Sequence, residues 1–532
     1  MGVLASKSAA CHATHMTKSS TIVVLGSLLV AAVLGSALSA QERISRGFWK
    51  TEAANDIYVL EKEARGAHGS IKVKFEMKIS DKAHGLALVF WNAEQPKAKL
   101  LAFTKWDEPN LPGSFAIAFD CYDPRATKVK GKSRIEWFDA RGNFYGRPQH
   151  QISLHFDGRE RENIVSPVEF RSAEHVKVDA HLEVVCGGSE LTLKIDGQKV
   201  FDHYFVPAVL AYDSQIHMGF RNREGAQLDV QKINIERSEI LEGDDAPETV
   251  RTFDKELIAT AKPTIKDFEL VERCDKFGRI IAAFTISKPE GGWDQWDRSG
   301  RIDIKVGDDK WLELCRIMTP YRREWTWYQD VTDYAPLLQG KVTLRLRIPT
   351  WIGSVEKKKG FAITLDLQYY EYRGGHNVIS IQPVWRVKAP VGDPARPIEK
   401  SLPAQSFDVP ANCKGAKLRM IITGHNGHSN IAEFTPLTFW INANKKRLEH
   451  RLWIENSWLN PCRPQGGTWK FDRAGWRPGD LVPPLHFDLS NAIEPGKKLK
   501  LSYGMQDWVD EKRNEKGGAG HHDISACLVF YR

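Results

Sequence analysis

Two acidic residues in the second half of the chain have neighbours suited to acid–base chemistry. Asp297 precedes Arg298 in the segment WDQWDR, shortly before the alternating run RIDIKV, and Glu433 lies between Ala432 and Phe434. A carboxylate can activate water as a general base, and a second acid can protonate a leaving group. Taken alone, an Asp-Arg pair at a strand start is also typical of a surface ion pair, and Glu433 also fits a salt-bridge partner or a cap.

The elements that must position these groups are strands. Apolar and polar residues alternate over residues 71–79, 191–195, 342–348 and 361–369. This is the pattern of a strand with one buried and one solvated face. The pair Asp196-Gly197 is a hairpin-turn signal between two such runs. No long stretch has helical periodicity, so we predict an all-β protein built from sandwiches.

The chain of 532 residues is too long for one hydrophobic core, since single cores stop growing at about 250–300 residues. Residues 238–248 are acidic, polar and typical of a linker, and a shorter break lies at residues 372–376. We therefore predict a signal peptide at residues 1–40 and three sandwiches at 44–237, 249–372 and 376–532.

The N-terminus has the pattern of a secretory signal. Lys18 precedes an uncharged, largely apolar run over residues 21–40 that ends in small residues. We expect the protein to be secreted, or placed in the periplasm or at the cell surface. An uncleaved membrane anchor is the alternative, because about 20 apolar residues span a bilayer.

Charge and cysteines narrow the possible partners. The net charge is +8, but the basic residues are interspersed with acidic residues along the chain. This pattern favours solvated loops over a nucleic-acid surface. We expect no nucleic-acid partner, and no membrane contact beyond the possible anchor. Seven of the eight cysteines follow the predicted signal, and none has metal-ligand spacing. An odd number leaves at least one thiol free.

An ordered set of short motifs runs through the second half of the chain. It comprises TVRTFDK (249–255), GGWDQWDRSGRIDIKV (291–306), MTPY (318–321), DVTDY (330–334), IITGHNGHSNIAEF (421–434), PQGGTW (464–469), DRAGWRPG (472–479) and QDW (506–508). In order and spacing this set resembles the peptide-N-glycosidase F family. The resemblance implies two eight-stranded antiparallel jelly rolls with an active site at their junction. It also implies an amidase that hydrolyses the glycan–asparagine bond of N-glycosylated proteins or glycopeptides, with no cofactor.

The same resemblance assigns site residues. It places Asp297 and Glu433 at the family's two catalytic carboxylates, one from each jelly roll, with Asp297 as the water activator. It places four further residues at substrate-binding positions, namely Arg298, Trp351, Arg473 and Trp476.

The chain also departs from the family pattern. The family's third acid falls on Pro349, and its paired cysteines fall on Ile431 and Thr435 and on Ser457 and Arg477. These departures favour, as the alternative, a non-catalytic glycan-binding protein on the same fold.

Histidines support a second alternative. His425 and His428 lie in GHNGH, and His521 and His522 lie near the C-terminus. Imidazoles at such spacing can bind copper, and the double jelly roll also serves copper-dependent peptidylglycine-type monooxygenases. Polar loop histidines are the simpler interpretation, because no His-Thr-His or methionine ligand pattern accompanies them. We predict no metal site.

Residues 44–237 resemble the concanavalin-like lectin and laminin-G sandwiches. The likeness lies in GSFAIAFDCYDP (113–124), in LTLKIDGQKVF (191–201) and in the strand-like run at 216–236. It implies a carbohydrate-binding accessory domain. Asp120 and Asp123 fit either calcium ligands or structural carboxylates.

Overall fold

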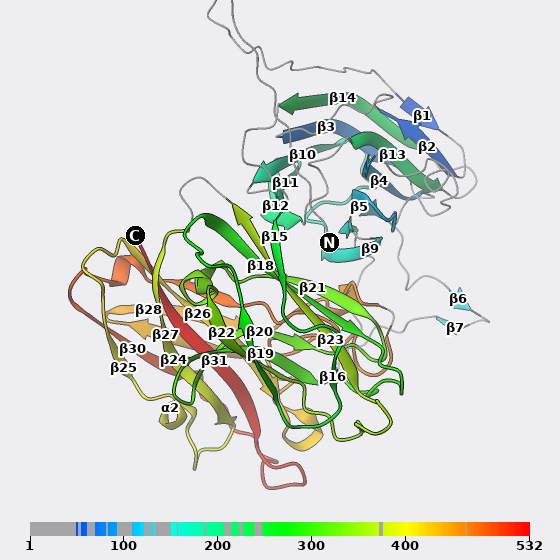
Figure 1. The fold of residues 1–532 in the computed structure, drawn as a ribbon. Coiled ribbons are helices and arrows are strands. Elements are labelled where there is room, and N and C mark those ends of the chain that lie inside the picture. The colour runs from blue at the N-terminus through cyan, green and yellow to red at the C-terminus, as the bar shows by residue number, and fades with distance from the viewer. Residues whose placement is uncertain are drawn as a thin grey trace, which may run out of the picture. The chain divides into compact units, whose positions relative to one another are not determined.

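A computed structural model shows a protein built mainly of antiparallel strands (Figure 1). The predicted signal peptide lies outside the described residues. No helix among the described residues is long and apolar enough to cross a membrane. The structure describes residues 49–51, 55–60, 70–80, 83–92, 109–121, 128–129, 132–133, 150–156, 158–185, 188–206, 214–222, 227–238, 247–371, 376–463 and 465–532.

The strands before residue 239 form two six-stranded sheets around one apolar core. The predicted alternation holds in β3, where every second residue is buried. The predicted hairpin is also confirmed, because Asp196 and Gly197 both have positive φ and Ile195 pairs with Gln198. The first sheet has the order β1 (Trp49–Thr51), β14 (Leu228–Ser238), β3 (Ser70–Ile79), β10 (Val176–Val185), β11 (Gly188–Ile195) and β12 (Gln198–Val206). The second has the order β2 (Asn55–Val59), β13 (Ser214–Asn222), β4 (Ala83–Asn92), β5 (Ser114–Asp120), β8 (Gln151–Phe156) and β9 (Arg159–Val165), and a separate ribbon pairs β6 (Lys128–Val129) with β7 (Lys132–Ser133).

The strands of residues 248–371 form the first jelly roll. The expected eight strands appear as nine described segments, because the edge strand is interrupted: β15 and β16 pair with successive parts of β23. Between them Phe253 turns into the core, and Lys255 has a positive φ of 45°. One sheet contains β15 (Glu248–Arg251), β16 (Glu256–Ile258), β23 (Phe361–Glu371), β18 (Phe277–Ser287) and β21 (Trp325–Asp330), and the other contains β17 (Thr264–Glu269), β22 (Lys341–Arg347), β19 (Ser299–Gly307) and β20 (Lys310–Met318).

The strands of residues 378–531 form the second jelly roll, with four strands in each sheet. One sheet has the order β24 (Val378–Val391), β31 (Gly520–Tyr531), β26 (Gly415–His425) and β29 (Leu485–Asp488), and the other has β25 (Gln405–Asp408), β30 (Lys498–Met505), β27 (Leu437–Ala443) and β28 (Lys446–Leu452). The short helices of the two jelly rolls are η2 (Thr332–Leu337), α2 (Ile398–Ser401), η3 (His428–Asn430), η4 (Ser457–Leu459) and η5 (Ser490–Ala492).

The apolar core of the first jelly roll continues into the second. Cys462, Cys527 and Val529 pack into the same cluster as strands β18 to β23. The six cysteines that the structure describes are buried free thiols. The predicted all-β class and the antiparallel double jelly roll are confirmed.

Candidate active site

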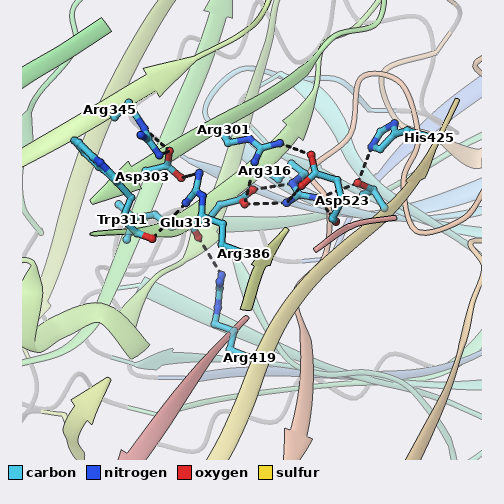
Figure 2. A network of polar contacts seen from close by, with 12 residues as sticks. Arg301, Asp303, Trp311, Glu313, Arg316, Arg345, Arg386, Arg419, His425 and Asp523 are labelled. Carbon is cyan, nitrogen blue, oxygen red and sulfur yellow. Dashed lines mark hydrogen bonds and ion pairs between the residues drawn. The ribbon is translucent and has the colours of Figure 1, made fainter. Parts of the chain in front are cut away.

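A network of buried charges joins the two jelly rolls (Figure 2). Arg316 of β20 donates to both carboxylate oxygens of Glu313, at 2.7 and 2.8 Å. It also donates to two groups of the second jelly roll, the hydroxyl of Thr423 at 2.8 Å and the carbonyl of Asp523 at 2.7 Å. Arg301 of β19 donates to the Asp523 carboxylate at 2.5 Å. Burial acts to raise the pKa of Asp523, but Arg316 and Arg301 hold it well below its ordinary value.

A buried carboxylate fixes the turn that contains Asp297. Asp294 is fully buried and accepts hydrogen bonds from the Trp296 amide at 3.0 Å and the Thr350 hydroxyl at 2.5 Å. It also accepts one from Arg298 Nε at 2.9 Å. The structure thus pairs Arg298 with Asp294. Sequence reasoning did not assign Asp294, although it lies in the same motif as Asp297 and Arg298.

Asp297 and Glu433 converge on one nitrogen atom. Arg473 Nη1 lies 3.1 Å from Glu433 Oε2 and 3.7 Å from Asp297 Oδ2. Arg473 is 1% exposed, donates to the Thr468 carbonyl at 2.8 Å and lies 4.3 Å above the Trp476 ring. A fixed guanidinium therefore holds one carboxylate from each jelly roll in the same place.

Burial raises the pKa of both carboxyl groups. Burial raises the pKa of Glu433 to about 7, with a further contribution from the charge of Asp297, while Arg473 opposes the rise. Burial also raises the pKa of Asp297, against Arg473 and a hydrogen bond from the Tyr321 hydroxyl. Asp297 starts from the lower ordinary value of 3.8, against 4.5 for Glu433. With a pKa of about 7, Glu433 can hold or release a proton near neutral pH, which is what a catalytic acid requires.

Tyr321 is a second residue that sequence reasoning did not assign. Its hydroxyl hydrogen-bonds to Asp297, and its ring packs on the glycine loop of PQGGTW. Gly467 has φ of +65°, and a Cβ there would lie 2.4 Å from the Tyr321 ring, so a larger residue would displace Tyr321. Both segments belong to the motif set, which was the available signal, but only the fold brings them together.

A cleft of about 480 Å³ opens over the carboxylate pair. Trp351 is 72% exposed and lies 4.5 Å from the Arg298 guanidinium, and Trp296 is 49% exposed. Their open aromatic faces suit stacking against sugar rings. Trp476 is only 4% exposed, and its Nε1 donates to the Gly424 carbonyl at 2.8 Å. Its ring therefore packs against Arg473 from the protein interior. All six predicted site residues line this one cleft, namely Asp297, Arg298, Trp351, Glu433, Arg473 and Trp476, and Pro349 lines it too.

The histidines do not gather into a metal site. His425 and His521 line the cleft with ring centroids 5.6 Å apart, but His428 contacts Asp510 at 3.2 Å and His522 is buried elsewhere. Burial lowers the pKa of His425 well below its ordinary value. Within the described residues, no three His, Cys, Asp or Glu side chains are grouped as metal ligands. In the N-terminal sandwich Asp120 is buried at the end of β5, and Asp123 lies outside the described residues.

The fold and the site together define a double-jelly-roll protein with a carboxylate pair at the domain junction. Residues 395–529 match the family described as Peptide-N-glycosidase F, C terminal. Peptide-N(4)-(N-acetyl-beta-D-glucosaminyl)asparagine amidase F of Elizabethkingia miricola is 28% identical over 264 residues, which cover 45% of this chain and 70% of that protein.

Solved structures also resemble the chain. PNGase F, a glycosylasparaginase from Flavobacterium meningosepticum, matches at 24% identity with a TM-score of 0.47, covering 54% of this chain and 96% of that one. A structure of PNGF-II matches at 14% identity with a TM-score of 0.44, covering 87% of this chain and 98% of that one. The family match and the sequence relative both support a relationship of the C-terminal half of the chain to the peptide-N-glycosidase F family.

Proposed function

We propose that the protein is a peptide-N-glycosidase-type amidase that hydrolyses the bond between an N-linked glycan and its asparagine. The observation that carries the proposal is the convergence of Asp297 and Glu433 on Arg473 Nη1, at 3.7 and 3.1 Å, beneath an open cleft. The family relationship supports the same chemistry, because the relative from Elizabethkingia miricola is an asparagine amidase.

We propose a part for each group. Ionised Asp297 accepts a proton from a water that attacks the amide carbonyl carbon. Glu433, whose pKa lies at about 7, donates a proton to the departing glycosylamine nitrogen. Arg473 keeps the carboxylates in place and stabilises negative charge as it develops on the carbonyl oxygen. Trp351 and Trp296 offer faces to the sugar rings.

The test is incubation of the purified protein with a denatured N-glycosylated protein. We expect released glycan together with the mass change of asparagine to aspartate at the glycosylated site. Asp297→Asn and Glu433→Gln should abolish both signals. Asp309→Asn and Glu511→Gln are matched controls, because both side chains are exposed and lie outside the cleft. Equal activity in Asp297→Asn and the parent would contradict the proposal.

Pro349 favours the second candidate, a glycan-binding protein without catalysis. It lines the cleft at the position where the family carries a third acid, so this wall has one acid fewer. Under this alternative the parent protein binds the glycopeptide through the tryptophan faces but releases no sugar. The same incubation, followed by a binding measurement, separates the two outcomes.

Two further parts of the proposal concern the N-terminal region. We propose that the sandwich of residues 44–237 holds carbohydrate for the amidase, on the basis of its lectin-like strand pattern and its own apolar core. Expressed alone it should be retained on some member of a broad glycan array, and no retention would reduce it to a spacer. We also propose that residues 1–40 direct export and are removed, which N-terminal sequencing of the exported protein tests.

A further inference from the structure

A strongly basic cavity adjoins the catalytic cleft. Its volume is about 630 Å³, and Arg301 and Arg347 line both the cavity and the cleft. Whatever occupies the cleft therefore lies within reach of this cavity. Its charged lining consists of five cations and one acid, namely Lys262, Arg301, Arg345, Arg347, Arg386 and Asp303.

The acidic residue of the cavity, Asp303, is already paired with two of its arginines. Asp303, which is 1% exposed, contacts Arg345 and Arg386 at 2.8 Å each. Arg301 is paired with Asp523. Arg347 is exposed and has no ion pair within the part of the chain that the structure describes. The cavity thus keeps an excess of positive charge, with Arg347 as its uncommitted donor.

The strand register makes this excess costly. Arg347 of β22 lies directly opposite Arg301 of β19, and like charges in directly opposed positions destabilise a sheet. Neighbouring acids compensate Arg301 but not Arg347. Local costs of this kind are expected at functional or strained positions.

Pro349 leaves Arg347 without an acidic neighbour two residues away. It lines the cleft together with Arg347, while Ile348 between them is fully buried. An acid at position 349, as in the family, would lie beside Arg347 and neutralise it. In this chain the guanidinium remains available for an anion from outside.

We propose that this basic cavity binds an anionic group of the substrate that occupies the cleft, a carboxylate, sulfate or phosphate close to the glycosylated asparagine. The proposal rests on the proposed function, because the anion arrives on an N-glycopeptide. Arginine forks suit such oxyanions, which accept two parallel hydrogen bonds from one guanidinium. The anion is close to the asparagine because Arg301 and Arg347 belong to both sites.

The test measures binding to the full-length Asp297→Asn protein, so that hydrolysis does not interfere. Three synthetic glycopeptides serve as probes: a neutral peptide with diacetylchitobiose on asparagine, the same peptide with a 6-O-sulfate on the asparagine-linked sugar, and the neutral glycan on a peptide with aspartate beside the asparagine. A charge-assisted hydrogen bond contributes enough for a preference of about tenfold. We expect one acidic probe to bind about tenfold more tightly than the neutral probe. The preferred acidic probe shows whether the glycan or the peptide carries the anion.

Arg347→Gln in the same background should bring the acidic-to-neutral ratio close to one, and Arg347→Lys should retain part of it. Lys341→Gln is the matched control, because it removes a positive charge from the other end of β22. Equal binding of all three probes, no measurable binding of the acidic probes, or an equal loss in Lys341→Gln and Arg347→Gln would overturn the proposal. Failure of the amidase function has a different signature, a retained acidic preference with no sugar release by the parent protein.

Discussion

Replacing Glu433 by glutamine should abolish activity and yet stabilise the protein at alkaline pH. The pKa of Glu433 is about 7, against an ordinary value of 4.5, and one pKa unit corresponds to about 1.4 kcal/mol. Above pH 8 the ionised carboxylate therefore costs about 3 kcal/mol of folding free energy. Glutamine has nearly the same shape and no charge, so it avoids this cost.

The sign follows from the direction of the shift. The folded-state pKa is higher than the unfolded one, so between these values the folded protein holds more protons. The contribution of Glu433 to stability is complete below about pH 4.5 and is lost as pH rises through 7. The stability difference between Glu433→Gln and the parent should therefore grow by about 2–3 kcal/mol between pH 5 and pH 8.5.

Calorimetric melting of parent and variant at both pH values checks this expectation, with Glu511→Gln as the exposed control. The melting temperature of Glu433→Gln should exceed that of the parent by several degrees at pH 8.5, with a much smaller difference at pH 5. Glycan release should fall by about 10²–10⁴-fold. A stability difference that does not change with pH would refute the burial argument for Glu433.

Four further variants test other parts of the site. Asp297→Asn should lower the rate of glycan release by about 10²–10⁴-fold while the melting temperature stays within a few degrees of the parent. Tyr321→Phe removes a hydrogen bond that lowers the pKa of Asp297, so the acid limb of the kcat/KM pH profile should move to higher pH. An acid limb that does not move would show that Tyr321 does not influence the pKa of the catalytic base. Trp351→Ala should weaken glycopeptide binding by roughly 1 kcal/mol with unchanged melting, because the side chain is 72% exposed. Arg316→Met leaves the buried Glu313 without its nearest cation and should cost about 3–5 kcal/mol in denaturant unfolding; near-parent stability would show that the junction does not depend on this charge.

The fold was largely predictable because strand alternation is a local signal. Residues 342–348 alternate strictly, and β22 covers nearly the same stretch. The interrupted edge strand was not predictable, since the break at Phe253 depends on that ring entering a core formed by distant strands.

The candidate site was predictable only as a set of matched motifs. Residues 297, 433 and 473 are far apart in the sequence, and their meeting depends on the junction between two domains. The pairing of Arg298 with Asp294 depends on how the turn at 291–298 folds back on Thr350. Such contacts have no periodic signature, so sequence patterns locate the segments but do not show which side chains meet.

The Arg316 network has a consequence for how substrates reach the site. Arg316 has its partners on both sides of the junction, so moving the jelly rolls apart would break three of its five side-chain hydrogen bonds. We therefore expect the cleft to keep a nearly fixed width and not to open around a folded glycoprotein. The glycoprotein must then change its own conformation: its glycosylated segment must bend away from the glycoprotein surface or unfold first. A compact glycoprotein should for this reason be a poor substrate, and the same glycoprotein should become a good one after heating.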